Sequence, residues 1–246
     1  MDNLNEHPQI AELIETLDKN GMQKEKTEVQ SLVDYIGDME HTLTGMLSEL
    51  QNMRQEIGLI HNSSLRAKCQ NLVQKTDDKI RQGFAACKKM KDNLIRFARD
   101  AMKAFHEKGK DALAASVRAM KIPEVLDKVA VMFRKMSGDL AQNSVRLESM
   151  QSELRSSKNH LKNAGLLLIG RAPKEAEKAK KDKGTLTRLS HLSLKTGKVF
   201  ASLEQKAMDT ADKLRVSRVK DSVKTELQNL KRTTNDKTIF EPSRDR

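Results

Sequence analysis

Apolar residues recur along the chain at the alternating three- and four-residue spacing that is typical of coiled-coil helices. The longest regular run begins at Val29 and ends at Ile60. Its period is 3.5 residues, so on a straight helix the apolar stripe would drift, and the run predicts a left-handed supercoil against a partner helix. Its central positions, here named the first seam, are the residues that we expect to bind that partner: Ile36, Met39, Leu43, Met46, Leu50 and Met53.

A second seam follows the sequence "KIPEVLDKV", where Pro123 fits the first turn of a helix because its missing N–H has no partner there. This seam runs from Leu126 to Leu168. Asn143 and Ser157 occupy two of its inward positions, where a buried polar group can fix the register of two helices. Its last members run into the apolar sequence "GLLLIG" at 165–170, which we expect to pack at the end of a bundle rather than dock on another protein or dip into a lipid interface.

The segments around the two seams also predict helices. "HNSS" at 61–64 offers a helix stop and an N-cap, so it favours a hairpin over one continuous rod. "PQIAELIETLDKNGM" predicts a short amphipathic helix that begins near Pro8 and ends at Asn20 and Gly21. After Pro173, the run "KEAEKAKKDKG" has no apolar face and predicts a linker.

These segments predict an all-α protein, an elongated helical bundle with long coiled-coil hairpins. Composition agrees, because 37% hydrophobic, 33% charged and 3% aromatic residues provide little material for a thick core. The expected organisation is a short N-terminal helix (1–21), a helical body (22–170, with helices at about 24–60, 64–119 and 123–168), a linker (171–184), a semi-independent basic helical arm (185–232) and a disordered tail (233–246).

Charge is distributed unevenly along the chain, although the net value is +12. Residues 1–60 hold four Lys/Arg against twelve Asp/Glu, whereas residues 165–246 hold twenty against eleven. This asymmetry leaves three uses open: docking within the chain, head-to-tail association of chains, and attraction to a polyanion.

The sequence offers little for catalysis. Its six histidines are isolated from one another, and it has no metal-binding or phosphate-binding motif. Two cysteines, Cys69 and Cys87, are too few for a disulfide framework and fit a reduced compartment as core or seam residues. We therefore expect a cytoplasmic protein that is not an enzyme, needs no cofactor or metal, and has little affinity for membranes, because no apolar run approaches the ~20 residues of a membrane span.

Two functional hypotheses remain, both without catalysis. The first is an interaction protein that binds a protein partner, or itself, through coiled-coil surfaces. The alternative is an accessory protein that binds the phosphate backbone of DNA without sequence preference. The candidate phosphate contacts share one basic helix: Lys213, Arg215, Arg218, Lys220 and Lys224.

Several strings suggest a family resemblance: "SSLRAKCQNLVQKTDDKIRQGF", "AMKIPEVLDKV", "LRVSRVKDSVKTELQNLK" and the opening 40 residues. With these, the chain resembles a family of uncharacterised proteins carried on integrative conjugative elements of gut Gram-positive bacteria. The resemblance covers nearly the whole chain and implies cargo of a mobile genetic element. It carries over no catalytic or binding residue.

Overall fold

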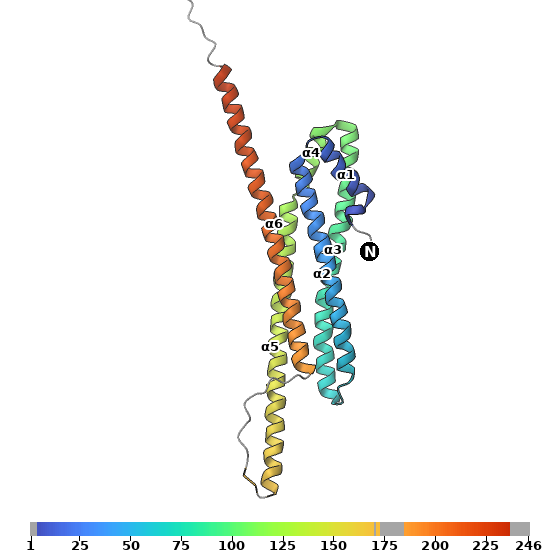
Figure 1. Cartoon of the computed structure of the whole chain (residues 1–246), viewed down its shortest axis with the longest axis vertical. Coiled ribbons are helices and arrows are strands. Elements are labelled where there is room, and N and C mark those ends of the chain that lie inside the picture. The colour runs from blue at the N-terminus through green and yellow to red at the C-terminus, as the bar shows by residue number, and fades with distance from the viewer. Residues whose placement is uncertain (1–3, 170, 173–184, 237–246) are drawn as a thin grey trace, which may run out of the picture.

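The protein is all α-helical over the residues that the computed structural model describes, which are 4–169, 171–172 and 185–236. A 3₁₀ turn, η1 (Leu4–Glu6), precedes six α-helices (Figure 1). These helices are α1 (Pro8–Lys19), α2 (Gln23–Gly58), α3 (Ser63–Lys108), α4 (Lys110–Ala119), α5 (Ile122–Leu168) and α6 (Thr185–Asp236). The described ranges contain no strand, so the predicted all-α class is confirmed. Most of the expected linker and the last ten residues lie outside the described residues.

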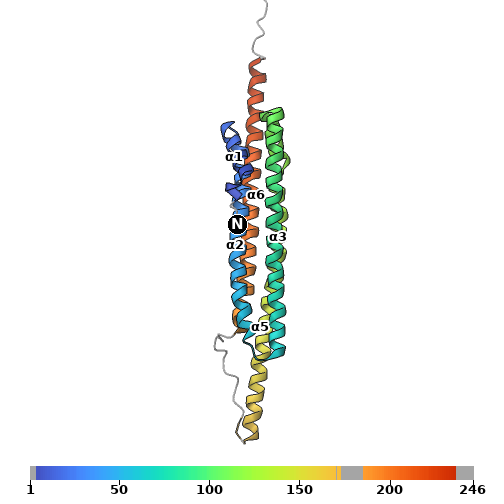
Figure 2. The ribbon, with the colours of Figure 1, turned by 90° about the vertical axis from the view of Figure 1, so that its right-hand side faces the viewer.

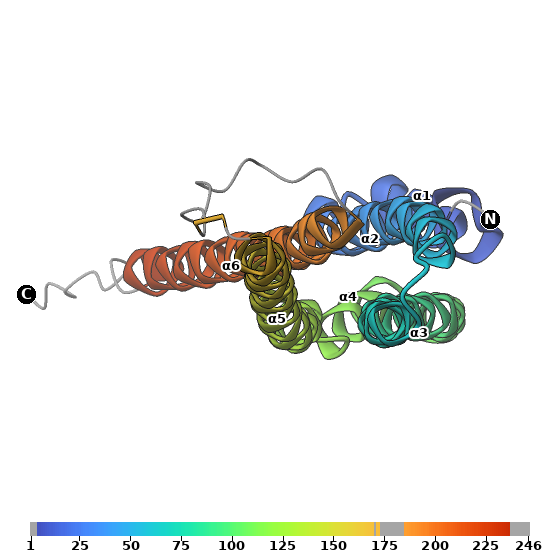
Figure 3. The ribbon, with the colours of Figure 1, turned by 90° about the horizontal axis from the view of Figure 1, so that it is seen from below.

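Four long helices form the bundle, and they are arranged as two antiparallel hairpins. Helices α2 and α3 make one hairpin, and α5 and α6 make the other (Figure 1). The shorter α1 and α4 lie against the end of the first hairpin at which α2 begins and α3 ends. A view rotated by 90° shows the same rod from the side, so the molecule is elongated (Figure 2). Seen from the end, α2 lies beside α6, and α5 lies between α6 and the region of α3 and α4 (Figure 3).

Local capping residues set the helix boundaries that the sequence predicts. The side chain of Asn62 accepts a hydrogen bond from the Leu65 N–H at 2.9 Å and caps α3. This cap confirms the hairpin at 61–64, because α2 has already ended at Gly58. Pro8 and Pro123 lie in the first turns of α1 and α5, as expected.

The expected helix at 64–119 is wrong in one respect, because it is two helices. Helix α3 ends at Lys108, and Gly109 has a φ of 77° before α4 begins. Glycine adopts this left-handed region without the steric penalty that other residues meet. The chain therefore folds back at Gly109, and α4 returns along the bundle toward the start of α5.

The core is thin and continuous, and it draws on every helix. Gly83 of α3 lies so close to α2 that a Cβ atom there would be 3.0 Å from Leu43 Cδ2. The same Cβ position lies 3.7 Å from Cε1 of Phe133 in α5, whose ring stacks on that of Phe200 in α6 with centroids 5.4 Å apart. The two hairpins therefore share one core.

Helix α6 packs on α5 through small residues. The Ser193 hydroxyl donates to the Leu140 carbonyl at 2.9 Å, and the Ser144 and Ser190 hydroxyl oxygens are 3.0 Å apart. A Cβ atom at Gly197 would lie 3.4 Å from a backbone carbonyl of α5. The expectation of a semi-independent C-terminal arm is therefore wrong over this stretch, because serine and glycine let the two backbones approach closely. Helix α6 also continues to Asp236, beyond the predicted end at 232.

The antiparallel α5–α6 pair is staggered. Arg215 pairs with Asp127 near the start of α5, and Gln151 donates to Thr187 near the start of α6. Residues 152–168, here named the α5 tip, extend past this hydrogen bond by about 25 Å at 1.5 Å per residue. The first turns of the tip, from Leu154 to Lys158, still lie near Leu65 and Leu186. Residues 216–236, here named the α6 free end, extend past the first contact by about 30 Å. The two overhangs point out of opposite ends of the rod (Figures 1 and 2).

Candidate interaction surfaces

A row of ion pairs joins the acidic face of α2 to the basic face of α6. Asp38 pairs with Lys206 at 2.9 Å, Glu49 pairs with Lys195, and Glu56 pairs with Arg188 at 2.8 Å. From one pair to the next, both helices advance by eleven residues and then by seven, in opposite directions. Steps of seven and eleven return to the same helix face, so the row follows one line along both helices. Contacts between α2 and α6 of the same chain therefore neutralise part of the acidic charge near the N-terminus and part of the basic charge near the C-terminus.

Glu28 and Arg218 form the most buried pair of this interface. Two nitrogens of the Arg218 guanidinium donate to the two Glu28 oxygens at 2.7 and 2.8 Å, and Glu28 is only 2% exposed. The other pairs of the row are solvent-exposed on both sides, and such pairs each contribute about 0–1 kcal/mol. Glu28 and Arg218 therefore dominate the energetics of this contact, because a buried carboxylate needs its partner.

These contacts change the status of the candidate phosphate-binding residues. Arg215 is bound to Asp127 and Asp212, and Arg218 is bound to Glu28. Lys213 and Lys220 are exposed, and the side chain of Lys224 lies outside the described part of the protein. The five residues share one helix as expected, but two of them already neutralise carboxylates of the same chain.

A polar cleft of about 430 Å³ opens between α2 and α6, between the Glu28 and Asp38 pairs. Its hydroxyl-bearing residues are Thr27, Ser31, Tyr35, Thr210 and Ser217. Carboxylates and lysines of both helices also line the cleft. In the described residues, no three His, Cys, Asp or Glu side chains are grouped so that they could hold a metal ion.

The first seam lies inside the bundle. All six of its residues, from Ile36 to Met53, are buried against other helices of the same chain. The partner helices that the heptad pattern predicts are therefore supplied by the protein itself. Binding of another protein through these side chains would require the bundle to open, so the expected partner-binding seam is a core seam here.

The second seam, by contrast, loses its cover along the α5 tip. Along one row of this seam, exposure rises from 1% at Leu147 to 41% at Leu154, 75% at Leu161 and 88% at Leu168. Leu167 and Ile169 are also exposed. The prediction that "GLLLIG" packs on the bundle is therefore wrong for these residues, because neither α6 nor the first hairpin extends far enough to cover them.

The α6 free end carries a second uncovered apolar row. Leu214 is buried, but Val216, Val219, Val223 and Leu227 are each at least half exposed. Val216 lies two residues after Leu214, and two residues correspond to a rotation of about 200° around a helix. The apolar side of α6 therefore changes face opposite the first turns of α5, and the valines point away from the α5–α6 contact.

The two cysteines are buried and free, as predicted. Burial, with a smaller contribution from Glu40, raises the pKa of Cys87 to about 11, and its thiol donates to the Ile36 carbonyl at 3.7 Å. Burial also raises the pKa of Tyr35, whose hydroxyl donates to the Leu203 carbonyl at 3.2 Å. A thiol with a raised pKa is a poor nucleophile, and these groups connect helices within the core.

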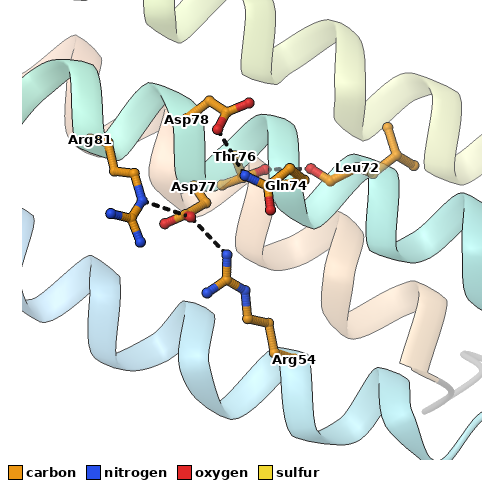
Figure 4. A network of polar contacts seen from close by, with 7 residues as sticks. All are labelled: Arg54, Leu72, Gln74, Thr76, Asp77, Asp78 and Arg81. Atoms are coloured by element: carbon orange, nitrogen blue, oxygen red, sulfur yellow. Dashed lines mark hydrogen bonds and ion pairs between the residues drawn. The ribbon is translucent and has the colours of Figure 1, made fainter.

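Asp77 of α3 lies at the centre of a polar network that sequence reasoning missed (Figure 4). Its Oδ2 accepts from Arg54 of α2 at 2.7 Å and from Arg81 of α3 at 2.9 Å. Burial acts to raise the pKa of Asp77, but the hydrogen bonds from Arg81 and Arg54 together outweigh it and lower that pKa. The spacing of Asp77 and Arg81, one helical turn apart, was a signal available in the sequence. The contact of Arg54 with Asp77 joins two helices, so only the fold reveals it.

The fold defines the class of this protein as an elongated all-α bundle built from two long antiparallel hairpins. None of the helices in the described ranges is both long and apolar enough to cross a membrane. The chain belongs to a family of unknown function, DUF6674, which matches residues 6–246. No curated protein and no solved structure matches the chain.

Proposed function

We propose that the protein is a non-enzymatic interaction or scaffold protein that binds a protein partner through its two uncovered helix ends. The observation that carries this proposal is the pair of exposed apolar rows on the α5 tip and the α6 free end. Contiguous apolar residues exposed on one face of a helix are typical of a surface that another chain covers. Helices bind such surfaces by inserting side chains at three- and four-residue spacing.

The setting of this activity is also part of the proposal. The low cysteine content favours a reducing cytoplasm, and the resemblance in sequence to proteins carried on integrative conjugative elements supports a role as cargo of a mobile genetic element. A scaffold role there is compatible with accessory work in conjugation, with maintenance of the element, or with interference with host defence.

Site-specific photo-crosslinking in the native cell tests the proposal. A photoreactive residue is placed at Leu161 or at Val219, and after irradiation the crosslinked products are isolated with and without nuclease. We expect a discrete protein adduct from either position that survives nuclease treatment. The matched control is the same residue at Val131, which is exposed on the covered length of α5. Equal labelling from Val131, or no protein adduct from either overhang, would reject this function.

A second candidate function is binding to the DNA backbone through α6. The exposed lysines Lys213 and Lys220 and the net charge of +12 favour it. Replacing both lysines by Gln should weaken binding to duplex DNA at ~50 mM salt and flatten its salt dependence, because each phosphate contact contributes to the slope. Arg215 and Arg218 are unsuitable for this test, since their replacement also breaks contacts within the chain. A wild-type protein that shifts no duplex DNA at this salt concentration excludes the candidate.

A further inference from the structure

The two overhangs have matching geometry. The α5 tip leaves one end of the rod and the α6 free end leaves the other (Figure 1). Their lengths, about 25 Å and about 30 Å, agree within a turn or so of helix. The stagger of one antiparallel pair creates both, so each overhang continues a helix past the end of its α5–α6 partner. The α6 free end keeps one described contact with α2, through Arg218 and Glu28.

Both overhangs also carry the side chains of a helix–helix contact. On the α5 tip, Leu154, Leu161 and Leu168 lie seven residues apart, with small residues at 157 and 164 between them. On the α6 free end, Val216, Val219 and Val223 follow the three- and four-residue spacing. Leucines separated by small residues on one helix leave room for β-branched residues of another, as in knobs-into-holes packing.

The directions in which the two overhangs leave the rod determine which overhang of one copy can pack on which overhang of another. When two copies are placed end to end with the same orientation, the α5 tip of the first points toward the second, and the α6 free end of the second points toward the first. The two helices then run antiparallel, as α5 and α6 already do within one chain. Contact between copies would therefore continue an established interface in the same sense.

We propose that the partner of each overhang is a second copy of this chain, joined head to tail by the α5 tip of one copy and the α6 free end of the next. This inference rests on the proposed function and names the partner class. The contact joins two different surfaces, so it is heterologous, and a heterologous contact that does not close into a ring extends into an open chain of copies.

The charge of the overhangs gives the association its salt dependence. Residues 152–168 hold three Lys/Arg against one Asp/Glu, and residues 216–236 hold five against three, so both overhangs carry a net positive charge and repel each other. Salt screens this repulsion and leaves the apolar contact in place. Association should therefore strengthen as salt rises, in the opposite direction to binding of DNA.

Sedimentation and light scattering of the full chain at increasing protein concentration test the inference. We expect the wild-type mass to rise with concentration without reaching a plateau at two copies. The paired change Leu161→Ser with Leu168→Ser removes one surface, and Val219→Ser with Val223→Ser removes the other. Each variant should remain monomeric and keep its helix content, because the replaced side chains are exposed. Val131→Ser in α5 and Leu194→Ser in α6 are matched controls that should associate like the wild type.

Mixing the two overhang variants gives the decisive result. The α5-tip variant retains an intact α6 free end, and the α6 variant retains an intact α5 tip. An equimolar mixture should therefore form a one-to-one dimer that grows no further. If either surface instead bound its own counterpart symmetrically, one variant would still associate alone and the mixture would add nothing.

Three outcomes overturn the inference: a wild-type protein that stays monomeric at every concentration and salt level, an overhang variant that associates normally, or a mixture that yields no dimer. The crosslinking experiment separates these failures from failure of the proposed function. A monomeric protein whose overhangs still crosslink to a different protein keeps the interaction function and loses only self-association. If the protein neither associates with itself nor crosslinks to another protein through its overhangs, both proposals are rejected.

Discussion

At the scale of single residues, the stability of the bundle depends on a few carboxylates that lie inside it and are held by arginines. Glu28 is bound by Arg218 of α6, and Asp77 is bound by Arg54 of α2 and Arg81 of its own helix. Both acids connect a helix of the first hairpin to a neighbour. Because a buried charge without a partner is costly, these pairs should respond to substitution more strongly than the exposed pairs around them.

Replacement of Arg218 by Gln should lower the free energy of unfolding by about 2–4 kcal/mol, because Glu28 would remain buried without its cation. The matched change Lys206→Gln removes an exposed pair in the same row and should cost less than about 1 kcal/mol. Urea titrations monitored by circular dichroism measure both values. Equal effects from the two variants would contradict the central role given to Glu28.

Asp77 makes acid sensitivity a second test. Its pKa is lowered in the folded protein, so its stabilising effect is present above the unfolded value of about 3.9 and is lost as the pH falls through the folded value. Asp77→Asn should therefore cost about 1–2 kcal/mol between pH 5 and 7, and the difference from wild type should shrink below about pH 4. Unfolding midpoints measured across this pH range decide the matter, and a difference that grows toward low pH would refute the assignment.

At the scale of helices, the sequence predicted where they lie better than where they break. Pro8, Pro123 and Asn62 mark boundaries through steric and hydrogen-bonding rules that act within a few residues, and all three lie at the predicted positions. Gly109 was missed because glycine also occurs inside α2, at positions 37 and 45, without breaking that helix. The positive φ at Gly109 depends on how α4 returns to the bundle, which local sequence does not contain.

The α5–α6 contact was missed for a related reason. Its central residues on α6 include Ser190, Ser193 and Gly197, which no apolar pattern detects. They face α5 because small side chains allow a close approach, so polarity gave no sign of their burial. A periodic row of small residues was the available signal.

Gly83 offers a direct test of close packing between elements. Gly83→Leu should lower the free energy of unfolding by about 1–3 kcal/mol, because the added atoms collide with Leu43 in the core. Gly45→Leu is the matched control: no atom lies within 4 Å of a Cβ there, so leucine should stabilise α2 by about 0.5–1 kcal/mol through helix propensity. Thermal unfolding of the two variants gives the comparison. Similar melting temperatures would show that α3 does not need glycine at this point.

At the scale of the whole molecule, the heptad pattern predicted which side chains form helix–helix contacts. It did not predict how far along each helix a contact continues. The second seam is regular from Leu126 to Leu168, yet its last part is uncovered because α6 begins near Gln151 and leaves the rest of α5 without a partner from α6. The stagger follows from the relative lengths of helices and connections, which a repeat within one helix cannot report. The exposure of Leu167, Leu168 and Ile169 at the end of α5 could therefore not be predicted from those residues alone.

Limited digestion tests how the C-terminal helix is attached. From the sequence we expect trypsin to cut first at basic residues of the predicted linker, ahead of the equally basic stretch at 79–110. These sites are Arg171, Lys174, Lys178, Lys180, Lys181 and Lys183, most of which lie outside the described residues. The two fragments should still elute together from a sizing column, because Phe200 and its neighbours are buried on α5. Fragments that separate without denaturant would restore the semi-independent arm.

The position of α6 also has a consequence for biosynthesis. It is the last of the described helices to be translated, yet it covers the face of α5 that includes Phe133 and Leu140 and neutralises acids on α2. During translation, that apolar face and the row of carboxylates stay open to water until nearly all of the chain has been made. A nascent or prematurely terminated chain would thus expose an apolar surface on α5 and an acidic surface on α2, both of which α6 covers in the folded protein. Such a chain should depend on chaperones or be degraded quickly.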